Sequence, residues 1–304
     1  MTGKLGQAPG VGGRLVVHAD PRLAERLRGL GGERMVFCAG LPGTGKSLLV
    51  HQLAHLAGNT GRLIHLLQWD TARPVFEASP AGRAYPLADG VTHAVIRKAA
   101  GLWARHALVG WNERHREPEH LLVGETPFVG NRFVELAHRL DDRAEVLLAG
   151  PSCRFAVVTP SREVRRFLEA ERERRAASPL HPREREDASP RVLRDLWRDL
   201  ARVARALGMS TASAGPAGGD DAPAPYDPLV YARVYERVLR YRNVEVVPLD
   251  VILPTDRLSV YDFAVAPVDL VPTEAEAEKF IREVERRYAD AAVLEQEIAR
   301  WWEV

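Results

Sequence analysis

An apolar segment that leads directly into a glycine-rich turn and then into a second apolar segment constrains this chain more than any other feature. Residues 40–47 read Gly-Leu-Pro-Gly-Thr-Gly-Lys-Ser and match the pattern G-x-x-x-x-G-K-[ST]. Residues 34–39 before the turn predict a strand, and the residues from Lys46 onward predict a helix. Glycines allow successive N–H groups to turn inward around an anion, beside the positive end of the helix. The segment therefore predicts a phosphate-binding loop.

The loop pattern also predicts the roles of its last two residues. Lys46 is expected to reach the β- and γ-phosphates of a nucleotide, and the Ser47 hydroxyl is expected to hold Mg²⁺. We therefore expect ATP and Mg²⁺ as cofactors, although the chain has no Asn-Lys-x-Asp motif that would read the base. The predicted nucleotide-binding residues are Gly40, Gly43, Thr44, Gly45, Lys46, Ser47 and Leu48.

Composition restricts the class of protein. The chain has 304 residues, of which 46% are hydrophobic and 27% charged, as in soluble globular proteins. A net charge of +1 argues against a generally basic surface that coats nucleic acid. We find no apolar run long enough to cross a bilayer and no apolar leader in the first ten residues, so we expect a cytoplasmic protein without a membrane partner.

Cysteine and histidine usage gives little indication of a metal site. Cys38 and Cys153 lie in apolar segments and are expected to be buried free thiols in a reducing compartment. The ten histidines have no cysteine or acid at a spacing that indicates zinc. His51 and His55, four residues apart on the helix after the loop, are expected to have surface or packing roles.

The order of apolar segments predicts an α/β fold with a doubly wound parallel sheet of about five strands. A short strand at 15–19 and a helix that starts at Asp20-Pro21 are expected to precede the first core strand. Residues 70–90, with three prolines, are expected to be irregular. The strands are predicted at 34–39, 62–69, 120–124, 154–158 and 244–247, and the later helices at 46–57, 92–115, 131–141, 161–175, 191–207, 228–241 and from Thr273 to the end.

The same pattern suggests a division of the chain. Residues 1–13 are expected to form a flexible N-terminus and residues 14–160 the nucleotide-binding core. Residues 161–241 are expected to form a helical lid with its support, including a flexible stretch at 210–225 that is rich in Ala, Gly, Pro and Asp. Residues 242–304 would then supply the last core strand and a C-terminal helix.

Two acidic residues are expected beside the loop. Asp70 and Glu125 end the predicted second and third strands, and the carboxyl ends of parallel strands meet at the ligand crevice. A carboxylate there can accept a hydroxyl proton or hold Mg²⁺ through water. The alternative interpretation is a helix cap or a solvated acid in a turn.

Arg73 follows Asp70 by three residues, so one segment presents both a base and a cation. A G-x-x-x-x-G-K-[ST] loop followed by Asp-x-x-Arg after the second strand resembles the P-loop kinases, especially polynucleotide 5′-kinases and zeta-toxin-like kinases, over residues 34–73. The resemblance implies a P-loop NTPase fold with strand order 2-3-1-4-5. It also implies that Asp70 is the general base and that Arg73 contacts a phosphate of the acceptor.

A second segment resembles another group of P-loop kinases. Glu125-Thr126 and Arg132 are similar to the Glu-Arg-Ser region of deoxynucleoside kinases, with the arginine displaced and Pro127 inserted. The resemblance adds Glu125 and Arg132 to the predicted acceptor-binding residues, and Glu125 is also a predicted ligand of Mg²⁺ through water.

An arginine-rich helix after the fourth strand stands where P-loop kinases place their lid. Its arginines could cover the phosphates, and Arg166 and Arg172 are the predicted catalytic residues beside Lys46 and Asp70. The alternative interpretation is a solvated helix with ion pairs between residues four apart. The candidate lid arginines are Arg165, Arg166, Arg172, Arg174 and Arg175.

Together these features predict an ATP-dependent phosphotransferase that acts on a hydroxyl or phosphate of a small or nucleotide-like acceptor. Two alternatives remain open. A polynucleotide 5′-hydroxyl kinase fits the Asp-x-x-Arg feature, and a nucleotide-gated regulatory ATPase fits the extra helical region and the long C-terminal helix.

Overall fold

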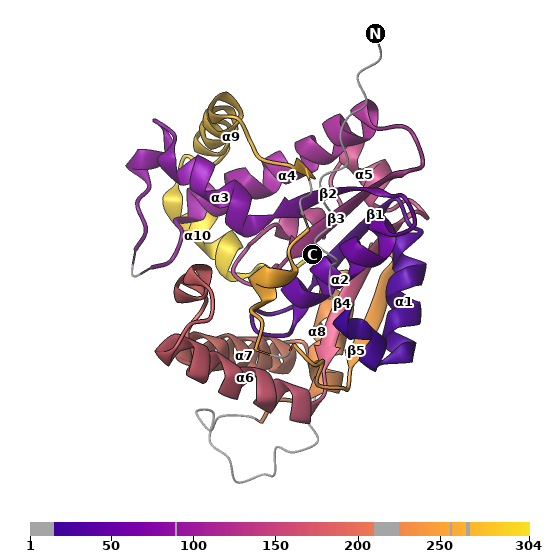
Figure 1. The fold of residues 1–304 in the computed structure, drawn as a ribbon. Coiled ribbons are helices and arrows are strands. Elements are labelled where there is room, and N and C mark those ends of the chain that lie inside the picture. The colour runs from indigo at the N-terminus through magenta and orange to yellow at the C-terminus, as the bar shows by residue number, and fades with distance from the viewer. Residues whose placement is uncertain (1–14, 89, 210–224, 256, 266–267) are drawn as a thin grey trace.

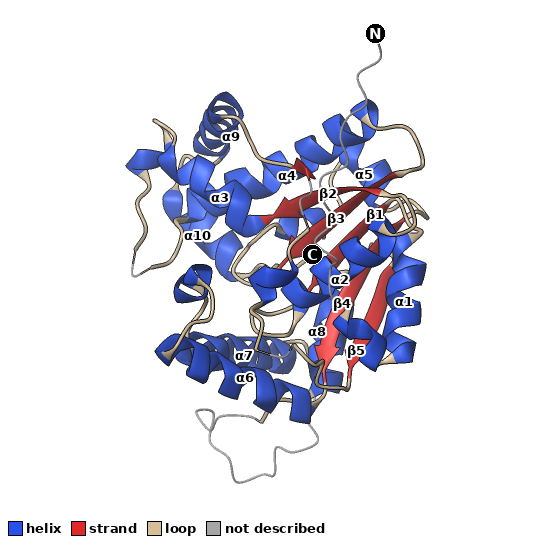
Figure 2. Ribbon diagram, in the orientation of Figure 1, coloured by secondary structure: helices blue, strands red, loops and turns tan. Residues whose placement is uncertain are grey.

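A single sheet of parallel strands, with helices on both faces, forms the centre of the molecule (Figures 1 and 2). The computed structural model describes residues 15–88, 90–209, 225–255, 257–265 and 268–304. The expected α/β class is therefore confirmed, with six strands in this part of the chain. The strands are β1 (Met35–Ala39), β2 (Leu63–Gln68), β3 (His120–Thr126), β4 (Cys153–Pro160), β5 (Val244–Leu249) and β6 (Val268–Asp269).

The strands lie in the order β5-β4-β1-β3-β2-β6. The first five have the neighbours expected from the order 2-3-1-4-5, and β6 adds a short edge beside β2 through the pairs His65↔Val268 and Leu66↔Asp269. The sequence did not indicate β6, because a two-residue strand is too short to show the alternation that identifies one.

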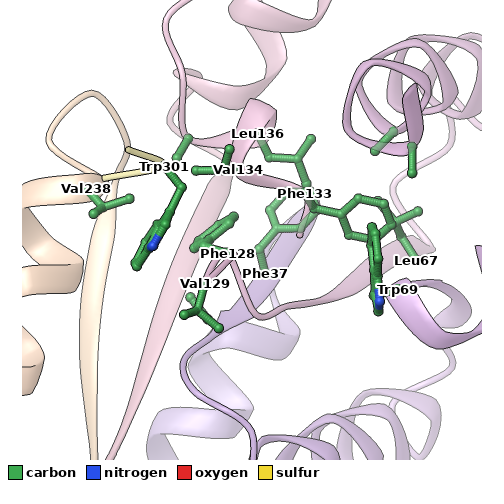
Figure 3. Packing of buried hydrophobic residues seen from close by; sticks show 14 of the residues in the cluster. Phe37, Leu67, Trp69, Phe128, Val129, Phe133, Val134, Leu136, Val238 and Trp301 are labelled. Carbon is green, nitrogen blue, oxygen red and sulfur yellow. The ribbon is translucent and has the colours of Figure 1, made fainter. Parts of the chain in front are cut away.

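The two faces of the sheet are covered by different helices. Val36 and Cys38 of β1 point to the face covered by α1 (Pro21–Gly31) and α2 (Lys46–Gly58). Phe37 points to the opposite face, where Phe128 and Phe133 lie with it in a buried aromatic cluster (Figure 3). The helices on that second face are α3 (Trp69–Ala78), α4 (Ala94–Arg114), α5 (Arg143–Leu148), α7 (Pro190–Ala206), α8 (Pro228–Val238), α9 (Glu274–Arg287) and α10 (Ala291–Ala299).

The segment after β2 is helical, so the irregular structure expected at 70–90 is wrong for its first half. Helix α3 starts at Trp69 and includes Pro74, followed by a 3-10 turn at Gly82–Ala84. Proline lacks the N–H that would bond to the carbonyl of Asp70, which weakens the helix. Burial of Ala72 and Phe76 on one face of α3 offsets that loss.

The helix expected at 131–141 is also wrong. Phe128, Asn131 and Phe133 have φ angles of 59°, 60° and 63°, which an α-helix does not allow. Only a 3-10 turn at Val134–Leu136 forms here, and α5 begins after Asp142, whose carboxylate caps it. The sequence signals for a helix were overridden by the tertiary contacts of this loop.

The two ends of the described chain differ from the predicted elements in smaller ways. Val16–Ala19 is a 3-10 turn and not a strand, whereas Asp20 caps α1 as expected. The single C-terminal helix predicted from Thr273 is two helices, because α9 ends at Arg287 and Asp290 caps α10.

The described part of the region expected to form the lid and its support, 161–241, contains α6 (Arg162–Ala177), a 3-10 turn at Pro182–Glu186, α7 and α8. Ser161 caps α6 as predicted, since its side chain accepts a hydrogen bond from Val164 N. The flexible segments expected at 1–13 and 210–225 lie outside the described residues, apart from residue 225. Within the described residues, no helix is both long and apolar enough to cross a membrane.

Candidate functional site

The loop between β1 and α2 has the backbone conformation that its glycines allow. Gly40, Gly43 and Gly45 have φ angles of 147°, 71° and 86°, a region in which side chains with a Cβ are strained. Gly45 stands immediately before α2, so the helix N-terminus opens directly behind the loop. Positive φ angles followed directly by a helix N-terminus are typical of loops whose N–H groups converge on an anion.

Close packing also requires two of these glycines. A Cβ at Gly40 would lie 2.3 Å from Tyr231 Oη, and a Cβ at Gly43 would lie 2.7 Å from Leu193 Cδ1. Tyr231 on α8 is fully buried, and its Oη accepts a hydrogen bond from Leu41 N at 3.0 Å. The helices α7 and α8 therefore support the loop from outside. No sequence pattern predicts this role for Leu193 or Tyr231.

Lys46 lies inside the loop. Its side chain is buried, and Nζ donates a hydrogen bond to Leu41 O at 2.8 Å, an oxygen that also accepts from Thr44 Oγ1 at 2.8 Å. Nζ also lies 3.9 Å from Glu125 Oε1. Burial lowers the pKa of Lys46, and the negative charge of Glu125 opposes this shift. An ammonium with little solvent contact interacts strongly with an incoming anion.

Glu125 connects the loop helix to the sheet. It is the second-last residue of β3, paired in register with Cys38 of β1 and Gln68 of β2, so β3 extends beyond its expected end. Its Oε1 accepts a hydrogen bond from Ser47 Oγ at 2.9 Å. Burial raises the pKa of Glu125, and Lys46 opposes this shift. A serine hydroxyl beside a carboxylate is an oxygen donor set that fits Mg²⁺.

Three further predicted residues gather at the same edge of the sheet. Asp70 stands in the first turn of α3, is exposed, and is close enough to influence the pKa values of Lys46 and Glu125. Arg132 is half-buried, and burial lowers its pKa while Asp70 raises it and Arg73 lowers it further. The structure therefore brings Asp70, Arg73 and Arg132 together around the loop.

The arginine of α6 that contacts the loop is Arg165. Its side chain is 2% exposed, and Nη1 lies 3.2 Å from Gly43 O and 3.4 Å from Pro42 O. Arg166 is exposed, and Arg172 pairs with Asp187. Among the described residues, no hydrogen bond or ion pair joins Arg166 or Arg172 to the loop, and their catalytic role stays a prediction. No local pattern distinguishes Arg165 from Arg166, because the buried side of α6 is known only from the fold.

Arg73 and Arg166 have surroundings that favour contact with a ligand. Arg73 Nε lies 3.8 Å from Glu77 and has no hydrogen-bond partner among the described residues. Arg166 lines a pocket between α6 and α7 together with Arg194, Trp197 and Tyr226. Both residues could therefore bind an anion without breaking a strong existing contact.

Comparisons with family models, with curated proteins and with solved structures found no match for this chain.

Proposed function

We propose that this protein is an ATP-dependent phosphotransferase with a P-loop NTPase fold. The observation that carries the proposal is the contact between the phosphate-binding loop and β3, in which Glu125 accepts from Ser47 and lies 3.9 Å from Lys46. This places an ammonium, a hydroxyl and a carboxylate at the opening of a helix N-terminus. Phosphoryl transfer requires such a set, because catalysis there consists mainly of positioning and charge stabilisation.

The donor side of the proposed site is formed by the loop and α2. Mg·ATP, when bound, would supply the phosphoryl group that is transferred. The loop N–H groups and Lys46 would hold the phosphate oxygens, Ser47 would bind the metal ion directly, and Glu125 would bind it through water. The strand order agrees with the one that the resemblance to P-loop kinases implies, which supports this assignment.

The acceptor side is formed by the residues after β2 and β3. Asp70 is exposed at the rim of the proposed site, where its carboxylate can accept the proton of an acceptor hydroxyl. The acceptor oxygen would then form the new bond to phosphorus while the bond to the leaving ADP oxygen breaks. Arg73 and Arg132 provide positive charge for an anionic acceptor, so a small or nucleotide-like acceptor with a phosphate fits best.

ATP turnover with a panel of acceptors tests the proposal. The panel contains nucleosides, nucleotides, sugar phosphates and a 5′-hydroxyl oligonucleotide, and the variants are Lys46→Ala and Asp70→Asn with the exposed Asp141→Asn as control. We expect acceptor-dependent turnover that Lys46→Ala abolishes, that Asp70→Asn lowers by about 10²- to 10⁴-fold, and that Asp141→Asn leaves unchanged. Equal turnover in wild type and Asp70→Asn would show that Asp70 is not the general base.

Two other outcomes identify the alternatives. Labelling of the oligonucleotide alone, with binding that weakens steeply with salt, would identify a polynucleotide kinase. Slow hydrolysis that no acceptor accelerates, together with nucleotide-dependent association of the chain, would identify a regulatory ATPase and contradict the proposal.

A further inference from the structure

Three histidines meet at the opposite end of the sheet from the phosphate-binding loop. They are His65 in β2, His115 directly after α4, and His120 at the start of β3. Each offers one ring nitrogen, and these nitrogens all lie within 4.8 Å of one another. His120 precedes Glu125 by five residues along β3, about 16 Å, and His65 is in register with Leu122, three residues or about 10 Å from Glu125 along the strand.

The rings face one another closely. His65 Nε2 lies 2.9 Å from His120 Nδ1, and the His115 ring centroid lies 4.4 Å and 4.5 Å from those of His65 and His120. Two imidazole nitrogens on one tetrahedral zinc ion are about 3.3 Å apart, given bonds of about 2.0–2.1 Å. One pair is thus already near the required separation, and rotation of the partly exposed His115 ring can bring the third nitrogen into place.

A carboxylate lies beside one of the three rings, at ion-pair rather than hydrogen-bond distance. His120 Nδ1 faces His65, while His120 Nε2 lies 3.8 Å from Glu117 Oε2. A carboxylate on the far nitrogen of a metal-bound histidine fixes the ring and increases its basicity. His65 is 4% exposed, and its Nδ1 has no hydrogen-bond partner within the described residues. The contact with His120 alone therefore leaves this buried ring only partly satisfied.

The protonation state also suits a metal. Burial, together with the neighbouring His115, His120 and Arg34, lowers the pKa of His65 to about 4. Burial also lowers the pKa of His115. These two rings are therefore neutral at pH 7, the form that binds metals. The positive charge of Arg34 opposes a bound cation, and Glu117 offsets part of that effect.

We propose that His65, His115 and His120 form a site for a divalent transition metal, with zinc as the best fit among common ions. Three imidazoles favour Zn²⁺ and its neighbours over Mg²⁺, and they leave a fourth position for water or an external ligand. A metal here would connect the end of α4 to β2 and β3. The proposal is independent of the nucleotide site. Sequence spacing did not show it, because only the fold brings His65 to the other two histidines.

Equilibrium dialysis of the full chain against ZnCl₂ tests the site. The chain is first stripped with EDTA, and excess Mg²⁺ is kept present so that Ser47 and Glu125 do not contribute. The variants are His115→Gln and His120→Gln, with the exposed His18→Gln as control, and circular dichroism checks the fold of each. We expect one zinc ion per wild-type chain, an affinity at least tenfold weaker in either cluster variant, and no change in His18→Gln.

Cobalt and thermal unfolding provide second readouts. We expect Co²⁺ to give the visible absorption of a low-coordinate nitrogen site in wild type but not in His115→Gln. We expect zinc to raise the Tm of wild type and of His18→Gln, but not that of His115→Gln or His120→Gln. Equal zinc affinity in wild type and both cluster variants would overturn the proposal, as would the absence of zinc binding by folded wild-type chain. If one cluster variant does not fold, the other decides the result.

Discussion

Arg165 Nη1 donates a hydrogen bond to the carbonyl oxygen of Gly43 over 3.2 Å and so connects α6 to the glycine-rich loop at residues 40–47. The same guanidinium bonds through Nε to Glu169 at 2.7 Å and through Nη2 to Leu193 O at 3.3 Å. Its charge is buried, yet each of its three nitrogens has an acceptor. The position of α6 is therefore coupled to the conformation of the loop, as a lid over a nucleotide site would require.

Replacement of this guanidinium should destabilise both elements. Arg165→Lys keeps the charge but cannot reproduce the three-way contact, so we expect the free energy of unfolding to fall by about 2–3 kcal/mol. Urea unfolding measures this change. The matched control is Arg166→Lys at an exposed position, for which we expect a change below about 0.5 kcal/mol. Equal effects of the two substitutions would contradict the structural role of Arg165.

The same pair of variants tests the arginine chosen from sequence. If Arg166 contacts the transferred phosphoryl group, Arg166→Lys lowers kcat without changing stability. Unchanged kcat in Arg166→Lys would exclude that role and leave Arg166 as a solvated residue of the pocket between α6 and α7.

Gly43 allows a second test, because two separate effects prevent a larger residue there. Its φ angle of 71° costs an alanine about 1 kcal/mol, and the new Cβ would lie 2.7 Å from Leu193 Cδ1. We expect Gly43→Ala to lower the free energy of unfolding by about 1–3 kcal/mol and to weaken nucleotide binding. In a Leu193→Ala background the loss should be smaller, since only the backbone strain remains.

Urea unfolding of wild type, Gly43→Ala, Leu193→Ala and the double variant measures the changes in stability. Fluorescence titration with a nucleotide measures the change in binding. The control is Gly58→Ala in the last turn of α2, where an added Cβ meets nothing within 4 Å, and we expect it to be neutral or slightly stabilising. Equal effects of Gly43→Ala in both backgrounds would show that Leu193 does not restrict the loop.

The features that sequence predicted are those with strong local signals. The loop glycines, Lys46 and Ser47 stand at fixed spacing, and the five longer strands are apolar runs between turn residues. Asp70 follows the second strand as predicted, but it lies in helix α3 and not in a loop. Pro74 indicated a loop, whereas the burial of Phe76 stabilises the helix. Local residue types do not encode that packing.

Other features depend on contacts between distant segments. Three non-glycine residues from Phe128 to Phe133 have positive φ angles that no local pattern indicates, and only the fold holds them. Arg165 rather than Arg166 faces the loop because the buried side of α6 is set by its contact with α7 and β4. The histidine cluster likewise depends on the pairing of β2 with β3.

A buried ion pair holds the loop that carries Arg132. Lys98 Nζ lies 3.0 Å from Glu135 Oε1, which also accepts from Asn131 Nδ2 at 3.0 Å. Burial lowers the pKa of Lys98, but the negative charges of Glu135 and Glu297 exceed this effect, so the pKa is raised. The pair therefore fixes Asn131, the residue before Arg132.

We expect Lys98→Met to lower the free energy of unfolding by about 3–5 kcal/mol, since it leaves Glu135 buried without its cation. The double variant Lys98→Met/Glu135→Leu should recover part of that loss. In the exposed pair of Arg198 and Asp195, Arg198→Met should cost less than about 1 kcal/mol. Urea unfolding measures all three, and no recovery in the double variant would contradict the explanation.

The pH dependence of stability provides a test at His51. This residue of α2 is buried, and burial lowers its pKa to about 4, with His55 and Arg183 adding to the shift. In the unfolded chain the pKa is about 6.5. The folded state thus binds fewer protons at this site between those values. The stability from the neutral ring is fully present above pH 6.5 and is lost as the pH falls toward 4.

We therefore expect the free energy of unfolding of His51→Gln to decrease less between pH 7 and pH 4.5 than that of wild type, by up to about 3 kcal/mol. Urea unfolding at the two pH values gives the difference. Carboxylates with lowered pKa values, such as Asp142 and Glu145, destabilise both proteins equally at low pH and cancel in the comparison. The exposed His18→Gln should keep the wild-type pH dependence. If wild type and His51→Gln lose equal stability, His51 must accept its proton in the folded state as readily as in the unfolded chain.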